Sequence, residues 1–225
     1  MIPTARDMAD AIWGNSQKLL EAEILDSKSE PAVRRLRAAL LKNGDKTDWE
    51  ISIARESGFI FNECISDKEI IFRPIISVDK IATRIVEGDK HPFSRLDISL
   101  DIACIDDKNH ARWHFDLANL KHHDVFQEGP KFHMQFGGHV PGRGNFWLDR
   151  PRWAHAPMDL ILLLEVVAAN FFYDKWNRYL RRNSSWCENV SQSERFCLSS
   201  YVANLQDIVN NSSQTVLSEF WANSD

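Results

Sequence analysis

The sequence has no excess of positive charge and no long apolar run. Its 225 residues carry 27 Lys and Arg against 32 Asp and Glu, a net charge of −5. No overall basic field therefore draws the chain to nucleic acid or to an acidic membrane. The most apolar stretch, residues 160–169, contains Glu165 and is shorter than the roughly 20 apolar residues that a membrane-spanning helix needs. We expect no membrane partner.

Cysteine is also scarce, and its spacing is uninformative for metal binding. Cys64, Cys104, Cys187 and Cys197 form no C-x-x-C pair and fit neither a zinc site nor a disulfide framework. Free thiols in a chain of this size are typical of a reducing compartment. The first residues lack the basic and apolar segments of a signal peptide. We therefore expect a cytoplasmic protein.

The signatures of common enzyme classes are missing. The chain has no G-x-S-x-G nucleophile elbow, no H-E-x-x-H zinc motif and no kinase signature. It also has neither the G-K-[ST] element of a Walker loop nor a G-x-G-x-x-G motif. The sequence alone thus leaves open whether the protein is an enzyme and which cofactor it would use.

Hydrophobic periodicity changes twice along the chain. Apolar residues recur at helical spacing in the first 42 residues, and again from Pro157 to about Arg182, over residues 193–210 and over residues 213–221. Strand-like patterns cover residues 58–65, 69–77, 93–105, 110–117 and 131–136. Period two with one apolar face predicts an antiparallel sheet of about five strands with one side on the core.

No linker divides these regions. The order of helices, antiparallel sheet and helices predicts a single α+β domain over residues 1–225. We expect N-terminal helices, a central antiparallel sheet, and C-terminal helices packed on one face of that sheet.

The polar face of the predicted sheet carries the residues that suggest chemistry. Its three strands contribute Arg95, Asp97, Ser99 and Asp101, then His110, Arg112, His114 and Asp116, and finally Lys131, His133 and Gln135. Solvated strands favour Thr, Lys and Glu instead. All eight histidines fall between His91 and His155. Because histidine changes charge near neutral pH and is a common base and metal ligand, we take this face as a candidate site. The alternative is an ordinary solvated sheet face.

A hairpin loop at residues 106–109 would set the register of two of these strands. It would pair Ile105 with His110 and place Asp101 beside His114. A carboxylate beside an imidazole orients the ring and raises its basicity. We predict Asp101 and His114 as an oriented catalytic base, with Asp97 and His133 as supporting acid or metal ligands. These groups would suit Zn or Mn, but no spacing matches a known metal motif, and no metal is assigned.

A segment rich in glycine and arginine follows the last predicted strand, from Gly137 to Trp153. Glycines let a backbone approach a ligand closely, and arginines bind phosphate or carboxylate through two parallel hydrogen bonds. The predicted anion ligands are His139, Arg143, Arg150 and Arg152, together with Arg112 and Gln135 of the sheet. The alternative is a structural crossover whose arginines cap carbonyl groups and pair with acids.

Residues 131–173 resemble a segment of a family of uncharacterised bacterial proteins. The resemblance rests on Lys131-Phe132-His133-Met134-Gln135-Phe136-Gly137, on Arg150-Pro151-Arg152, on His155-Ala156-Pro157 and on an apolar helix that ends Ala169-Asn170-Phe171-Phe172-Tyr173. Such proteins tend to be encoded in defence or mobile-element gene clusters and have no assigned catalytic residues. The order of elements is also similar to the ubiquitin-conjugating (E2-like) fold, but no cysteine stands in the crossover.

Two classes of function follow. The resemblance implies an intracellular bacterial accessory or partner-binding subunit, whose partner is another protein, in an antiviral defence or toxin–antitoxin system. The polar sheet face instead suggests a phosphodiesterase or nuclease that uses an Asp–His pair. The same pocket without turnover would make a nucleotide-sensing module. Nucleic acid or a nucleotide is thus a candidate ligand beside a protein subunit.

Overall fold

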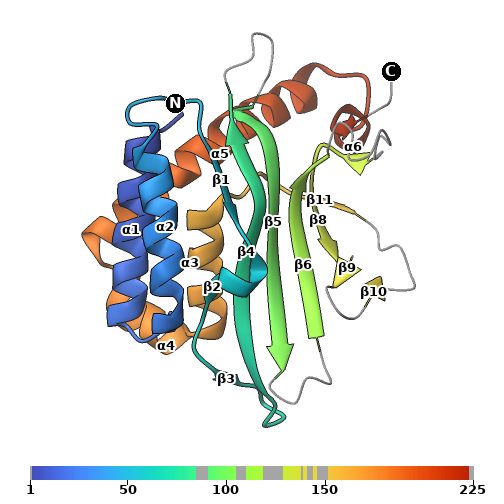
Figure 1. The fold of residues 1–225 in the computed structure, drawn as a ribbon. Coiled ribbons are helices and arrows are strands. Elements are labelled where there is room, and N and C mark those ends of the chain that lie inside the picture. The colour runs from blue at the N-terminus through green and yellow to red at the C-terminus, as the bar shows by residue number, and fades with distance from the viewer. Residues whose placement is uncertain are drawn as a thin grey trace.

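The computed structural model describes residues 2–84, 91–104, 110–118, 129–137, 139–140, 144–145 and 152–222, with the backbone alone at 110, 139–140 and 144–145. Helices pack on one face of a mainly antiparallel sheet (Figure 1). The predicted α+β class is confirmed. No helix in the described ranges is both long and apolar enough to cross a membrane.

Two helices open the chain: α1 (Ala5–Glu21) and α2 (Glu30–Leu41). A capping box starts α1, because the Thr4 hydroxyl accepts the Asp7 N–H while the Asp7 carboxylate accepts the Thr4 N–H, each at 3.1 Å. Pro31 lies in the first turn of α2, where its missing N–H does no harm. Both helices lie within the first 42 residues, where the apolar spacing predicts helices.

The main sheet has eight strands, more than the five expected. Its order is β1-β4-β5-β6-β8-β11, and β2 and β3 also pair with β4. The bounds are β1 (Glu50–Ile53), β2 (Phe59–Ile60), β3 (Cys64–Ile65), β4 (Ile71–Thr83), β5 (Phe93–Cys104), β6 (His110–Leu117), β8 (Phe132–Phe136) and β11 (Trp153–Ala154). The predicted 58–65 strand is thus two short strands that pair successively with β4. A 3-10 turn, η2 (Arg55–Ser57), connects β1 to β2.

Small elements complete the fold. They are the turn η1 (Ser27–Ser29), α4 (Tyr173–Lys175), the π-helix η3 (Trp176–Leu180), α6 (Val216–Glu219), and two short strand pairs, β9 (His139–Val140) with β10 (Gly144–Asn145) and β7 (Gly129–Pro130) with β12 (Trp221–Ala222). Pairing of β12 with β7 ties the end of the described chain to the start of β8.

The C-terminal helices differ from the prediction at their ends. Asp159 caps α3 (Leu160–Phe171) by accepting the Leu162 N–H at 2.9 Å, so Pro157 precedes the helix. The backbone breaks at Phe172 (φ −132°, ψ 41°) and resumes in α4. The next long helix, α5 (Ser184–Asn211), starts earlier than residue 193 because Asn183 caps it. The expected continuous helix to about Arg182 is therefore wrong.

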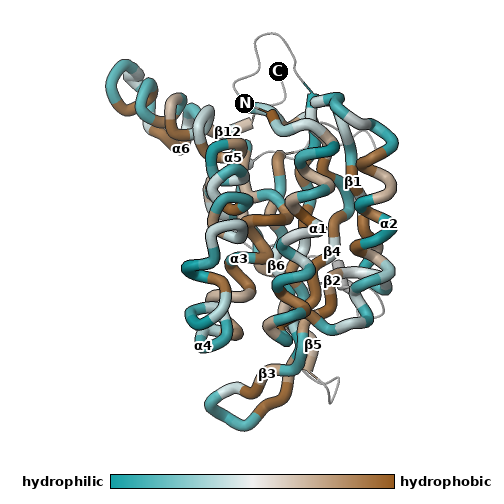
Figure 2. The backbone as a smooth tube through the Cα atoms, turned by 90° about the vertical axis from the view of Figure 1, so that its left-hand side faces the viewer, coloured by the Kyte–Doolittle hydropathy of each residue, from teal (hydrophilic) through white to brown (hydrophobic). Residues whose placement is uncertain are grey.

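One buried core joins the sheet to the helices. Alternation directs Ile76, Ile98 and Phe115 of adjacent strands toward the helical layer, and all three are buried. Figure 2 shows α3 as largely hydrophobic, as expected for a helix in the interior of the fold. Glu165 on α3 accepts the indole N–H groups of Trp176, at 2.8 Å, and of Trp186. The partners of the Glu165 carboxylate are thus two indole groups.

Candidate functional site

The second face of the sheet carries polar side chains in rows across β5, β6 and β8. The rows are Asp97, Asp116 and His133, then Ser99, His114 and Gln135, then Asp101 and Arg112. Burial distinguishes this face from a solvated one: Asp101 is 0% exposed, Ser99 1%, His133 4% and Arg112 5%. The polar side chains therefore meet at a sheltered place.

The register of β5 and β6 differs by two residues from the predicted one. Asp101 faces Arg112, and His114 faces Ser99. Ala103 pairs with His110, so the connection is longer than the expected hairpin loop, whose residues lie outside the described ranges. A shift of two keeps every side chain on its face, so period-two alternation fits both registers equally. The predicted Asp101–His114 pair is wrong.

Asp101 instead lies next to two guanidinium groups. Its Oδ2 lies 3.3 Å from Arg55 Nε and 3.6 Å from Arg112 Nη1. A buried carboxylate requires such partners because burial away from water penalises an isolated charge. This pairing explains the observed register, since it places opposite charges next to each other in the buried row.

Arg112 holds His114 in one tautomer. Its Nε donates to His114 Nε2 at 3.1 Å, and its Nη2 donates to Ser99 Oγ at 2.8 Å. Because a guanidinium only donates, the His114 ring proton must be on Nδ1, which lies 3.2 Å from Ser99 Oγ. Burial, followed by the Arg112 charge, lowers the pKa of His114 to about 4. His114 is thus a neutral ring with both nitrogens engaged.

Asp97 and Asp116 form a carboxyl pair at the centre of the site. One donor atom from each, with one from His114, lie within 4.8 Å of one another. Burial raises the pKa of Asp116 well above its usual value, and the neighbouring Asp97 charge raises it further. Burial and the Asp79 charge raise the pKa of Asp97, while a hydrogen bond from Asp116 opposes the rise. Two adjacent carboxylates repel, so ionisation of one opposes ionisation of the other, and the pKa of Asp116 is the one raised more.

His133 stands beside Asp116 as a second neutral imidazole. Its Nδ1 lies 3.0 Å from the Pro130 carbonyl oxygen, which can only accept, so Nδ1 carries the proton. Its Nε2 is an acceptor 3.9 Å from Asp116 Oδ2. Burial lowers the pKa of His133 to about 4. The ring therefore presents a lone pair to the carboxyl pair near neutral pH.

Arg152 supplies positive charge next to this row. Its Nε donates to Gln135 Oε1 at 3.3 Å. Burial has the largest effect on both neighbouring groups, since it raises the pKa of Asp116 and lowers that of His133. The charge of Arg152 lowers the pKa of each group in addition. The structure thus brings together Gln135 and Arg152, two of the predicted anion ligands, beside the carboxyl pair.

Other predicted ligands are outside what the structure describes. Arg143 and Arg150 lie outside the described residues, and His139 is described by its backbone in β9 alone. Their role as anion ligands stays a prediction. The same holds for phosphate binding by Arg112, whose three nitrogens contact Asp101, Ser99 and His114.

Sequence reasoning missed two acids of the site. Asp116 stood in the alternating pattern of the polar face, but the sequence analysis gave it no role. Asp79 occupies an irregularity between Val78 and Lys80, where β4 has one residue more than β5. Burial is the largest cause of the raised pKa values of Asp97 and Asp116, and the charge of Asp79 raises both pKa values further. Nothing in the alternation of residues 71–83 marks this bulge.

The donor set of Asp97, His114 and Asp116 also has the chemistry of a divalent-cation site. However, one nitrogen of His114 accepts from Arg112 and the other faces Ser99. In this arrangement the ring has no lone pair to give to a metal. We therefore assign no metal to this arrangement.

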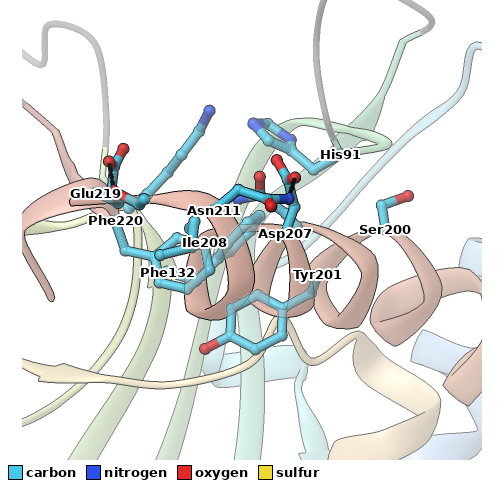
Figure 3. A pocket seen from close by; sticks show the side chains of 12 residues that line it. His91, Phe132, Ser200, Tyr201, Asp207, Ile208, Asn211, Glu219 and Phe220 are labelled. Atoms are coloured by element: carbon cyan, nitrogen blue, oxygen red, sulfur yellow. Dashed lines mark hydrogen bonds between the residues drawn. The ribbon is translucent and has the colours of Figure 1, made fainter. Parts of the chain in front are cut away.

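A separate cavity of about 340 Å³ lies between α5, α6 and the start of β8 (Figure 3). Tyr201 and Phe220 stack in its lining with ring centroids 5.1 Å apart, and Asn211 donates to Asp207 at 2.8 Å. Of the residues described around this cavity, Lys131 alone comes from the polar strand positions named above, and none is a predicted catalytic residue or anion ligand. The candidate site is therefore the polar sheet face.

Comparison of the chain with models of protein families, with curated proteins and with solved structures finds no match.

Proposed function

We propose that the protein hydrolyses a phosphodiester on the polar face of its sheet, by acid–base chemistry of Asp97 and Asp116. The observation that carries the proposal is the adjacent Asp97 and Asp116 carboxyl groups, whose pKa values are both raised. We propose that this pair shares one proton near neutral pH. Near neutral pH such a pair offers a base and an acid side by side. General acid–base catalysis needs both protonation states at one reacting centre.

The reaction balances on this pair. The Asp97 carboxylate takes a proton from a water molecule as the water oxygen attacks phosphorus. The Asp116 carboxyl gives its proton to the leaving oxygen as the phosphorus–oxygen bond breaks. The products are a phosphomonoester and an alcohol. The pair ends with one proton on Asp97, and transfer to Asp116 restores the starting state. His133 Nε2, next to Asp116, accepts a hydrogen bond from the attacking water or from the alcohol.

Arg152 supports an anionic substrate. Gln135 orients its guanidinium through Nε, and a guanidinium matches phosphate oxygens with two parallel hydrogen bonds. Arg55 and Arg112 lie beside the buried Asp101, at 3.3 and 3.6 Å from its Oδ2. We assign Arg152 to the phosphate because its charge acts on Asp116 and His133, and Arg143, Arg150 and His139 are proposed to add to it.

A partner-binding role is the second candidate, because β1 forms an edge of the sheet next to α2. A bacterial setting and a link to defence are proposals that rest on residues 131–173, and a cytoplasmic setting is a proposal that rests on the cysteine spacing and the first residues. Under this second candidate the polar face would hold a ligand without turnover.

The test is hydrolysis by the full chain of the dinucleotide thymidylyl-(3′→5′)-thymidine, whose alkoxide leaving group requires a proton. Asp116→Asn and Asp97→Asn should each lower the rate by about 10²- to 10⁴-fold, the usual contribution of a general acid or base. Asp48→Asn changes an exposed aspartate outside the site and should leave the rate unchanged. The rate should fall at low pH as Asp97 is protonated and at high pH as Asp116 ionises, since both pKa values are raised.

The same assay separates the alternatives. Equal rates with and without EDTA are expected. Loss of activity in EDTA and recovery with Mn²⁺ would replace proton transfer with metal-assisted hydrolysis. Rates of the Asp97 and Asp116 variants equal to that of Asp48→Asn would refute the assignment.

A further inference from the structure

Strand β1 leaves one edge of its backbone unpaired. Among the strands that the structure describes, it pairs with β4 alone. The Thr83 N–H donates to the Trp49 carbonyl at 3.0 Å, so the backbone of Trp49, and two residues later that of Ile51, faces β4. In an antiparallel ladder the residues between them face the opposite way. The N–H and C=O groups of Glu50 therefore point outward. Ile51 and Ile53 both pair with β4, on either side of a register irregularity, so we place the backbone groups of Ser52 on the outer side as well. No turn, loop or cap hydrogen bond between described backbone groups reaches either residue.

A groove of about 470 Å³ borders this edge. One wall is β1, and the other is the adjacent helix α2 (Figure 1). From α2 come Ala32 and Leu36, which are each 5% exposed and form the apolar floor of the groove, and the exposed Ala39 at its rim. The groove thus joins a row of backbone donors and acceptors to small apolar side chains.

Charge adds a further constraint on what fits. Arg35 lines the same groove and is exposed. It has no ion-pair partner among the residues that the structure describes, whereas Lys80 at the groove is paired with Glu50 at 2.6 Å. An acidic group on the occupant would complement Arg35.

We propose that this groove binds an extended segment of a partner protein, which adds a strand to β1. The added segment hydrogen-bonds to the backbone of Glu50 and Ser52, as in strand-addition complexes. Because side chains alternate along a strand, every second residue of the segment faces α2. Those residues are small and apolar, and a carboxylate of the segment pairs with Arg35. The proposal is independent of the hydrolytic function.

The test starts from a phage-displayed library of random decapeptides and the full chain. The peptides retained are synthesised with a fluorescein label, and their dissociation constants are measured by fluorescence polarisation. We expect small apolar residues at alternate positions and at least one acidic residue. Ser52→Pro removes the outward N–H, which proline can do on an edge strand without loss of a ladder bond. It should weaken binding at least tenfold, and Arg35→Glu at least fivefold.

Two controls keep the result unambiguous. Ser52→Thr retains the N–H and should change the dissociation constant less than twofold. Methylation of alternate backbone nitrogens in the peptide, with wild-type protein, should weaken binding at least tenfold without any change in the fold. A library that yields no common sequence, or peptides insensitive to both Ser52→Pro and N-methylation, would overturn the proposal. So would a wild-type dimer that Ser52→Pro converts to a monomer in sedimentation, since the occupant would then be a second copy of this chain.

Discussion

Replacing Asp101 with asparagine should destabilise the fold by about 3–5 kcal/mol, the usual range for breaking a buried ion pair by removing one partner. The Asp101 side chain is 0% exposed and that of Arg112 6%. Asparagine keeps the shape of the side chain and removes its charge. The guanidinium groups of Arg55 and Arg112 lie 3.3 and 3.6 Å from the lost carboxylate oxygen. They would then repel each other, and Arg112 would be left charged in a buried place, whereas Arg55 is 25% exposed.

Burial decides this magnitude more than distance does. Arg37 Nη2 lies closer to its partner, 3.0 Å from Asp10 Oδ1, but these side chains are 38% and 56% exposed. Solvent and salt screen such a surface pair, so Asp10→Asn should cost only about 0–1 kcal/mol. Asp10→Asn is therefore the matched control for Asp101→Asn.

The assay is urea unfolding at neutral pH, followed by far-ultraviolet circular dichroism and extrapolated linearly to water. Adding Arg112→Met to Asp101→Asn should recover part of the lost stability, because it removes one of the two unpaired charges. If Asp101→Asn costs no more than Asp10→Asn, or if the second substitution makes the loss larger, the account of this buried row is refuted.

Three further predictions concern single side chains. Asp116 has a raised pKa in the fold, so the folded state binds more protons than the unfolded state above the unfolded pKa, and stability falls as pH rises toward the folded pKa. Asp116→Asn should flatten that fall in urea unfolding from about pH 4 to about pH 9. The His133 ring should be neutral with its proton on Nδ1 at pH 7 and should titrate near 4, which ¹⁵N NMR of the ring will test. Glu165→Met leaves the Trp176 and Trp186 indoles without their acceptor and should cost about 1–3 kcal/mol in unfolding followed by tryptophan fluorescence. A cost equal to that of an exposed Glu→Met change would contradict this role for Glu165.

The long elements could be predicted because their patterns are strong. Strand β6 matches the predicted 110–117 strand, and β5 ends one residue short of the predicted 93–105 strand. Both alternate over many residues, so the apolar set defines the face. Strand β1 has only four residues and lacks enough alternation to show in the sequence. The break at Phe172 was also hidden, because the apolar pattern continues through it.

The sequence could predict which residues share the polar face, but it could not predict which of them lie opposite one another on adjacent strands. Alternation identified His114, His133 and Asp97 as sharing one face, which the rows of β5, β6 and β8 bear out. It could not choose between registers that differ by two residues. The choice depends on the charge pair of Asp101 with Arg112 and on the length of the connecting loop. The Asp97–Asp116 pair follows from that register and could not be found without it.

The central strands β5 and β6 are held by two unlike layers, one apolar and one ionic. Cooling weakens the apolar layer, since the hydrophobic effect declines at low temperature. Heating lowers the dehydration penalty of the ionic layer, because hydration of charged groups becomes less favourable as temperature rises. These opposite thermal responses should keep the two strands paired over a wider temperature range than the outlying β2 and β3, which are held by short contacts with β4.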